Sequence, residues 1–154
     1  MSRKAFLTGG VGVNSHVDAQ RRRQEAGPKM SLAAQPAPIS KGKHLLVDCR
    51  NVPRAVCLDD KTMLATMAAA ALQAGANVIG QMRYKFGVDS PPGFAAVIML
   101  DESHCSAHSY ADDGLIAIDL FTCGTTNPRD ILADIQKKIN LGDVTITEIP
   151  RFKV

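Results

Sequence analysis

The sequence has no tryptophan, few aromatic residues of any kind and no long apolar segment. Aromatic residues make up 5% of the 154 residues, and the apolar runs are short, the clearest being residues 94–100. A membrane-spanning helix needs about 20 apolar residues in succession, so a helical membrane protein is excluded. Four cysteines are too few for a disulfide scaffold. With 45% hydrophobic and 21% charged residues, the chain has the composition of one globular domain.

Positive charge is in surplus only near the N-terminus. The net charge is +3, but residues 1–41 hold seven basic and two acidic side chains, whereas the remaining 113 residues hold 11 basic and 13 acidic ones. The main part of the chain is therefore slightly acidic, and we expect neither a nucleic-acid nor a membrane partner. Residues 1–41 are also rich in glycine and proline and lack apolar periodicity. They predict a disordered basic extension, followed by a domain over residues 42–154.

Short patterns inside the extension do not point to a separate function. The apolar stretch at residues 5–13 has no small-residue cleavage site, which argues against a secretory signal. The glycines of residues 9–12 lack the Lys-Ser/Thr that completes a phosphate-binding loop, and the arginines of residues 21–23 are interpreted as a solvated charge run. Without a signal or a cysteine pairing pattern, we expect a cytoplasmic protein. Met30 is a candidate alternative start of translation.

Hydrophobic periodicity and turn signals predict strands and helices from residue 43 onward. We expect six strands, over residues 44–49, 77–86, 94–100, 104–110, 115–122 and 143–149. We expect two helices, one over residues 60–74 and one that begins at Asn127-Pro128. The Asp-Asp-Gly at residues 112–114 predicts a hairpin turn. This order predicts an α+β fold, a two-layer sandwich with a largely antiparallel sheet and two helices on one face.

Polar and nucleophilic side chains concentrate over residues 101–124. A strand that ends in Asp-Glu-Ser-His at residues 101–104 is unusual for a structural turn, because it places two carboxylates, a hydroxyl and an imidazole beside a sheet edge. One interpretation is a Ser-His-Asp hydrolase. It is disfavoured because Ser103 lacks the Gly-x-Ser-x-Gly elbow that exposes such a nucleophile.

A metal site is the second interpretation of this segment. Its ligands would be His104, Cys105, His108 and Cys123. Successive residues of a strand point to opposite faces, so His104 and His108 share one face while Cys105 points to the other. Two histidines on one strand face do not make a closed zinc site, and we expect no metal.

The third interpretation depends on two motifs. Residues 102–108 read Glu-Ser-His-x-x-x-His, and residues 119–124 read Asp-Leu-Phe-Thr-Cys-Gly. Together and in this order they closely resemble the proenzymes of the prokaryotic S-adenosylmethionine decarboxylases. The resemblance is densest over residues 98–124 and extends more weakly from Gly42 to the C-terminus, which leaves residues 1–41 outside it.

The resemblance implies that the chain cleaves itself between Glu102 and Ser103, into residues 1–102 and 103–154. The Ser103 hydroxyl attacks the carbonyl of Glu102 to form an ester, and β-elimination then frees the Glu102 carboxylate. The dehydroalanine left at residue 103 rearranges and hydrolyses to a pyruvoyl group, the covalent cofactor of the family. His108 matches the histidine that acts as the base in this processing.

The pyruvoyl group in turn implies a decarboxylase. Its ketone forms a Schiff base with the α-amine of the substrate and accepts the electrons left by departing CO2, as pyridoxal phosphate does in other enzymes. A general acid must then return a proton to the substrate carbon, and Cys123 matches the cysteine of the family in that role. The alternative interpretation of Cys123 is a buried structural thiol. Decarboxylated S-adenosylmethionine feeds spermidine synthesis.

Three further residues match substrate-binding positions of the family. Phe86 matches an aromatic residue that stacks on adenine, with a core aromatic as the alternative interpretation. Asp112 matches the acid that holds the ribose hydroxyls. His104 either positions the carbonyl or fills the first position of its strand, and His44 is interpreted as a structural histidine.

Three positions depart from the pattern of the family. Ala95 stands where the family usually carries a Ser or Thr that assists processing. Asp112 has a short side chain for a ribose ligand, and Tyr110 replaces the tryptophan near it. Cys49 replaces the aromatic residue that ends the first strand, so one wall of an adenine site would be missing.

Three hypotheses follow from this pattern. The favoured one is an S-adenosylmethionine decarboxylase that forms a homodimer of cleaved protomers. The second keeps the pyruvoyl chemistry but acts on arginine or ornithine, because the departures concentrate on nucleoside recognition. The third is an uncleaved, inactive homologue that binds an active partner chain, and Ala95 is its only support.

Overall fold

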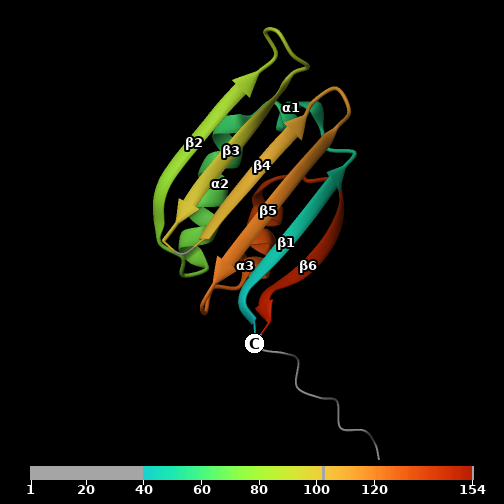
Figure 1. Ribbon diagram of the computed structural model, residues 1–154. Helices are drawn as coiled ribbons and strands as arrows, with labels where there is room; N and C mark the ends of the chain where they lie inside the picture. The colour runs from blue at the N-terminus through green and yellow to red at the C-terminus, as the bar shows by residue number, and fades with distance from the viewer. Residues whose placement is uncertain (1–39, 102, 154) are drawn as a thin grey trace, which may run out of the picture. The chain divides into compact units, whose positions relative to one another are not determined.

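The computed structural model describes residues 40–101 and 103–153 (Figure 1). In chain order the elements are β1 (Ser40–Arg50), α1 (Arg54–Cys57), α2 (Asp60–Gln73), β2 (Val78–Phe86), β3 (Gly93–Leu100), β4 (Ser103–Tyr110), β5 (Leu115–Cys123), α3 (Pro128–Lys138) and β6 (Asp143–Lys153). The disordered extension expected at residues 1–41 lies outside the described residues, except that residues 40 and 41 belong to β1. Glu102, on one side of the expected cleavage point, also lies outside them.

The six strands form one sheet in the order β2-β3-β4-β5-β1-β6, and every neighbouring pair is antiparallel. The helices α2 and α3 pack on the same face of this sheet, α2 against β2 and β3 and α3 against β5 and β1 (Figure 1). This arrangement confirms the predicted α+β sandwich. We call the opposite face, which no helix of the described residues covers, the uncovered face.

The hydrophobic core lies between the sheet and the two long helices. Alternate residues of the central strands point toward the helices, and the largest of them are fully buried: Leu45, Val47, Phe94, Ile98, Ile116, Ile118 and Leu120. The helices contribute Met63, Met67, Ile131 and Ile135. Because side chains alternate along a strand, the residues between these core positions must lie on the uncovered face.

Side-chain caps explain where the helices begin, and a glycine explains how the hairpin between β4 and β5 turns. The Asp59 carboxylate accepts a hydrogen bond of 3.0 Å from the backbone N–H of Thr62, which satisfies one of the free donors at the start of α2. Asn127 accepts from Arg129 in the same way at the start of α3, at 3.2 Å. The turn between β4 and β5 places Gly114 at a φ of +63°, a conformation that glycine adopts without strain.

The structure adds two features to the sequence prediction, a short helix and longer edge pairing. A short helix, α1, follows Pro53, whose ring holds φ at −55°, and nothing in the apolar pattern of so short a turn distinguishes it from a loop. Strands β1 and β6 are longer than expected, since they pair with each other through Ser40 and Lys153. None of the described helices is long and apolar enough to cross a membrane.

Candidate active site

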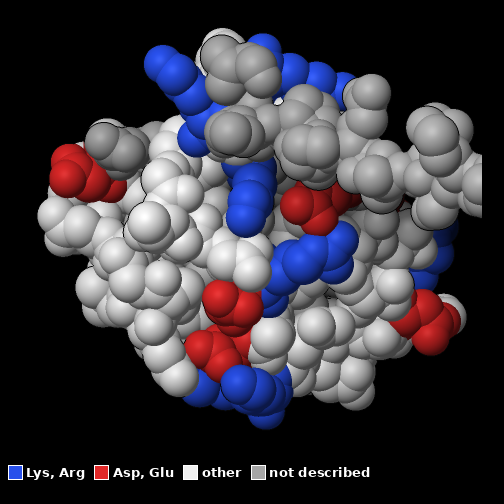
Figure 2. All heavy atoms as spheres, turned by 90° about the horizontal axis from the view of Figure 1, so that it is seen from below, with Lys and Arg blue, Asp and Glu red and all other residues white. Residues whose placement is uncertain are grey.

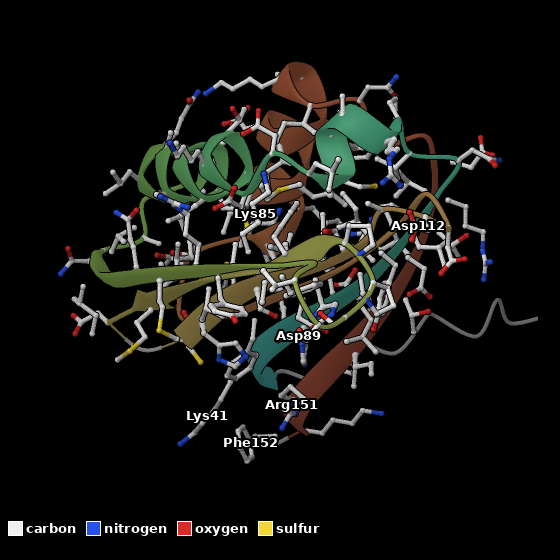
Figure 3. All side chains as sticks on the ribbon, turned by 90° about the horizontal axis from the view of Figure 1, so that it is seen from above. Lys41, Lys85, Asp89, Asp112, Arg151 and Phe152 are labelled. Carbon is white, nitrogen blue, oxygen red and sulfur yellow. The ribbon has the colours of Figure 1, made fainter. Side chains whose placement is uncertain are left out.

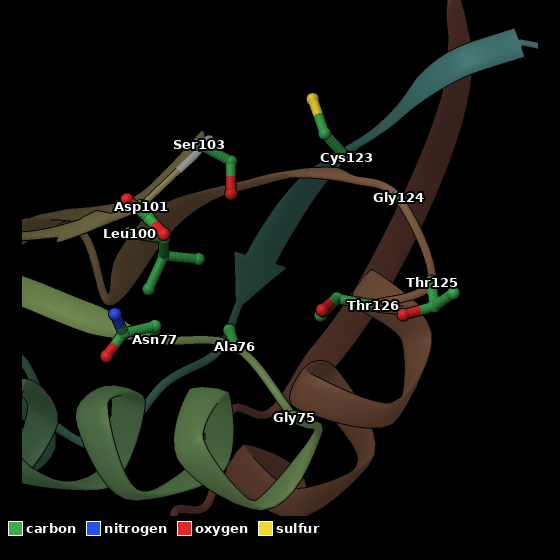
Figure 4. A pocket seen from close by; sticks show the side chains of 10 residues that line it. All are labelled: Gly75, Ala76, Asn77, Leu100, Asp101, Ser103, Cys123, Gly124, Thr125 and Thr126. Carbon is green, nitrogen blue, oxygen red and sulfur yellow. The ribbon is translucent and has the colours of Figure 1, made fainter.

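Ser103 and Cys123 meet at one end of the sheet, where β4 begins and β5 ends; we call this the near end. Both line a pocket of about 220 Å³ together with Asn77, Asp101 and Thr126, among others. Figure 4 shows that the two reactive groups point to opposite sides of the sheet. The Ser103 hydroxyl points toward the pocket on the helix side, whereas the Cys123 thiol points away from it.

Among the described residues, side chains of both charges lie at the surface of the near end. Figure 2 views this end from below and shows Lys and Arg side chains beside Asp and Glu side chains.

His108 and Phe86 lie at the opposite end of the sheet, which we call the far end. The His108 ring has its centroid 5.2 Å from that of Phe86 and 4.8 Å from that of Tyr110, so these three side chains form a continuous group on the uncovered face. Ala95 lies directly opposite His108 in the β3–β4 pairing. The position where the family carries a hydroxyl is therefore next to the histidine expected to assist processing.

The predicted catalytic residues are thus divided between the two ends. Ser103 and His108 are five residues apart in one strand, which corresponds to about 17 Å between their Cα atoms, and they point to opposite faces. Asp112, in the β4–β5 turn, also lies at the far end, where its carboxylate pairs with Arg54. One chain therefore carries the two parts of the expected site, which we call half-sites, at opposite ends of its sheet. Within one chain, neither His108 nor Asp112 lies near Ser103.

His104 belongs to a group of side chains on the uncovered face of the near end. Its ring centroid lies 5.6 Å from Phe121 and 6.3 Å from His44. His44 faces Asp119 at 3.6 Å between Nε2 and Oδ1, and its Nδ1 is 3.2 Å from an Arg151 nitrogen. Sequence reasoning gave Asp119 and Arg151 no role. The alternation of β5 places Asp119 on this face, but Arg151 reaches it only through the pairing of β6 with β1, which the sequence does not reveal.

The environment of His44 disfavours its charged form. Burial lowers the pKa of His44 below its ordinary value of 6.5, and the positive charges of Arg151 and His104 act in the same direction. Asp119 opposes them, because its carboxylate attracts the imidazolium. His44 is accordingly neutral near pH 7.

Three of the four cysteines are inert core thiols. Burial raises the pKa of Cys105 to about 12 and that of Cys49 to about 11, and it also raises the pKa of Cys57. Cys49 points toward the helices, so this position does not face Phe86 as the wall of an adenine site would. Cys123 is the one cysteine with partial exposure, which suits a residue that exchanges protons with a substrate.

Strand alternation places the histidines as predicted. His104 and His108 are both exposed on the uncovered face, while Cys105 is fully buried on the other. Across residues 40–101 and 103–153, no group of three or more His, Cys, Asp or Glu side chains is placed to hold a metal ion.

Comparison with known families agrees with this geometry. Residues 43–152 match the family model described as S-adenosylmethionine decarboxylase. The chain belongs to the S-adenosylmethionine decarboxylase family. This family is pyruvoyl-dependent, and the match excludes the first 42 residues, as the motifs implied.

The matches to individual relatives cover most of the length of each relative. The chain is 35% identical over 111 residues to the S-adenosylmethionine decarboxylase proenzyme of Moorella thermoacetica, covering 71% of this chain and 86% of that one. It is 35% identical over 115 residues to the proenzyme of Methanococcus maripaludis, covering 71% and 88%. The crystal structure of the adenosylmethionine decarboxylase from Aquifex aeolicus has the same fold, with a TM-score of 0.66 at 24% identity, over 75% of this chain and 93% of that one.

Ser103 has the surroundings that a pyruvoyl group requires. It is the first residue of β4, so a chain break before it leaves the strand intact. Its side chain is half-buried and points toward a pocket large enough for a small group, so the residues present fit the cofactor of the family.

Proposed function

We propose that this chain is a self-cleaving S-adenosylmethionine decarboxylase proenzyme. The observation that carries the proposal is that Ser103 and Cys123 lie at the same end of the sheet, within a chain that matches the family over residues 43–152. Cleavage between Glu102 and Ser103 produces chains of residues 1–102 and 103–154. The second chain begins with the pyruvoyl group, which supplies an electron sink for the loss of CO2.

The residues of this chain supply the remaining steps. The Ser103 hydroxyl is the nucleophile of processing, and His108 is its base. Cys123 lies at the near end on the uncovered face and donates the proton that replaces CO2 on the substrate carbon. Phe86, with Tyr110 and Asp112 beside it at the far end, provides an aromatic surface and a carboxylate for the nucleoside part of the substrate. A reducing cytoplasm suits this protein, whose four cysteines are all free thiols.

The half-sites come together in a homodimer that packs the two uncovered faces against each other. Large apolar side chains lie exposed there, including Met82 at 70%, Tyr84 at 68% and Met99 at 55% exposure. If the two sheets pair with their ends reversed, the near end of one protomer meets the far end of the other. His108 of one protomer then approaches the near end of its partner, where β4 begins at Ser103, and this arrangement accounts for the division of the site described above.

Charge supports the same arrangement. On the uncovered side, Figure 3 shows the basic Lys41 and Arg151 protruding at the near end, and Asp89 lies on this side in the loop between β2 and β3 at the far end. Reversed pairing places Lys41 and Arg151 of one copy near Asp89 of the other. Charges of opposite sign that meet in this way favour one orientation of the two protomers.

The mass of the purified protein tests the proposal directly. We expect two chains, residues 1–102 and 103–154, the second beginning with a pyruvoyl group, and a Ser103→Ala variant that remains one chain. A single full-length species after long incubation would identify the chain as an inactive homologue and contradict the proposal. Release of CO2 from S-adenosylmethionine, arginine and ornithine is then measured in parallel. Release from a free amino acid alone would favour the second hypothesis for the substrate.

A Cys123→Ala variant separates processing from turnover. We expect self-cleavage to remain largely intact, because the thiol points away from the Ser103 side of the sheet. Turnover should fall by about a hundredfold, the usual contribution of a positioned general acid. Unchanged turnover would remove Cys123 from the acid role, and Cys105→Ala is the matched control for losing a thiol from a neighbouring strand.

A further inference from the structure

Arg151 makes contacts that neither processing nor proton donation uses. Its guanidinium carbon lies 5.3 Å from the centroid of the Phe121 ring, and one of its nitrogens donates to Nδ1 of His44 at 3.2 Å. Both partners belong to the near end of the uncovered face. We propose that Arg151 is a positioning residue for turnover, which clamps the Phe121 ring beside Cys123. This inference builds on the proposed function.

The strand register explains why an arginine in β6 reaches a ring in β5. Cys123 pairs with Gly42 of β1, and Gly42 pairs in turn with Arg151, so the three residues form one row across the sheet. Gly42 has no side chain, and the Phe121 ring fills the space above it. A Cβ atom at Gly42 would lie 2.7 Å from Cε2 of this ring, closer than any such contact tolerates. The ring therefore lies across β1, between Cys123 and Arg151.

A series of polar contacts holds Arg151 over the ring. Because Arg151 donates to Nδ1 of His44, this nitrogen carries no proton, and the proton of the neutral ring is on Nε2. Nε2 is buried without a hydrogen-bond partner and faces one oxygen of the Asp119 carboxylate at 3.6 Å. The other carboxylate oxygen accepts a hydrogen bond from Ser106 at 3.3 Å. These contacts involve residues of β6, β1, β5 and β4, so they link four strands at the near end.

The clamp matters for turnover because of where Cys123 lies. Cys123 is the last residue of β5 and points to the same face as Phe121, two residues earlier. The chain leaves the sheet immediately after Cys123, so pairing with Gly42 and packing against the ring are what hold the thiol in place. A proton donor must sit within hydrogen-bond distance of the carbon it serves, so a small displacement of Cys123 slows proton return.

The decisive variant is Arg151→Gln, compared with Arg129→Gln. Arg129 in α3 pairs with Glu148 of β6 at 2.6 Å, so its loss removes an arginine that contacts β6 on the helix side. We expect both variants to cleave themselves as the unaltered chain does, because Arg151 and Phe121 lie on the uncovered face with Cys123, whereas the Ser103 hydroxyl points to the helix side. We expect kcat to fall about tenfold in Arg151→Gln with KM changed by less than about twofold, whereas Arg129→Gln retains both values. Arg151→Lys keeps the charge without the planar stack and should restore kcat only in part.

A second route disturbs the clamp without removing its charge. Gly42→Ala places a methyl group where the Phe121 ring lies, so it should lower kcat in the same way as Arg151→Gln. The titration of His44, followed by NMR, reports the contact itself. Its pKa should rise in Arg151→Gln, because Asp119 then acts without the opposing cation, and should stay unchanged in Arg129→Gln.

Each failure has its own signature. Equal turnover of Arg151→Gln and Arg129→Gln in an otherwise active protein would overturn the clamp and leave the proposed function standing. Loss of self-cleavage in Arg151→Gln would also overturn it, since Arg151 would then serve processing instead. A parent protein that neither cleaves itself nor releases CO2 would overturn the proposed function, and with it any role of Arg151 in turnover.

Discussion

Single residues decide how well this chain can process itself. Ala95 lies opposite His108, so the far end has an imidazole but not the neighbouring hydroxyl that the family usually places there. Adding that hydroxyl should stabilise the developing charge of the processing intermediate through a hydrogen bond.

An Ala95→Ser variant should therefore cleave faster than the parent chain. We expect the half-time of cleavage to shorten about tenfold, the effect of one well-placed hydrogen bond to a charged group. The measurement is the fraction of cleaved chain against time, by mass spectrometry after rapid purification. Ala117→Ser is the matched control, since Ala117 lies opposite His108 in the other neighbouring strand. An equal acceleration in both variants would show that the site of the hydroxyl is unimportant.

His44 makes the stability of the fold depend on pH. Its pKa in the folded chain is below the ordinary value of 6.5, so the unfolded chain binds more protons as the pH falls through that value. Stability is therefore present above about pH 6.5 and is progressively lost below it.

A His44→Asn variant should remove this dependence, because the amide oxygen accepts from Arg151 as Nδ1 does but does not titrate. We expect the melting temperature to fall less between about pH 7.5 and pH 5.5 in this variant than in the parent chain. His104→Asn controls for the loss of a histidine from the same face. An identical fall in the parent chain and His44→Asn would contradict the assignment.

At the scale of elements, the start of α2 depends on one carboxylate. Asp59 accepts from the backbone N–H of Thr62, and hydrogen bonding with the side chain and then with the backbone of Thr62 lowers the pKa of Asp59. Asp59→Ala should destabilise the fold by about 1 kcal/mol, the usual contribution of an N-cap. The melting temperature should fall by about 3–5 °C.

Asp59→Asn separates the hydrogen bond from the charge. An amide oxygen still accepts from Thr62, so this variant should keep most of the stability that Asp59→Ala loses. If both variants melt alike, the charge of Asp59 at the helix terminus is more important than the hydrogen bond.

Strand β4 also shows what one element contributes to function. It begins with Ser103 and reaches His108 five residues later, so its length keeps the two residues apart. No rotamer change within one chain joins them, because their Cα atoms are separated by about 17 Å. This separation is a property of any regular strand with this motif.

At the scale of the whole molecule, the proposed dimer predicts that two inactive variants complement each other when they are produced together. Ser103→Ala and His108→Ala variants should each remain uncleaved when produced alone. Produced together, they should form mixed dimers in which the His108→Ala chain is cleaved, since its Ser103 meets an intact His108 of the partner. Mass spectrometry distinguishes the two chains by the substitution they carry. Processing within one chain predicts no cleavage in any mixture.

Much of the fold was predictable because its signals are local. The continuous apolar stretch of β3, the caps Asp59 and Asn127 and the turn at Gly114 each act over a few residues, and all of them lie where the sequence placed them. The short helix α1 was missed because one turn has no periodicity to detect.

The sequence by itself determined the family and the fold class and predicted the reactive residues, because motifs and alternation are properties of neighbouring positions. Only the tertiary structure decided how those residues are arranged in space. It places Ser103 and Cys123 at the same end of the sheet and separates both from His108. It also brings Arg151 over Phe121 through two strand pairings. Such pairings depend on burial and register between segments far apart in the chain, for which no local pattern carries the information.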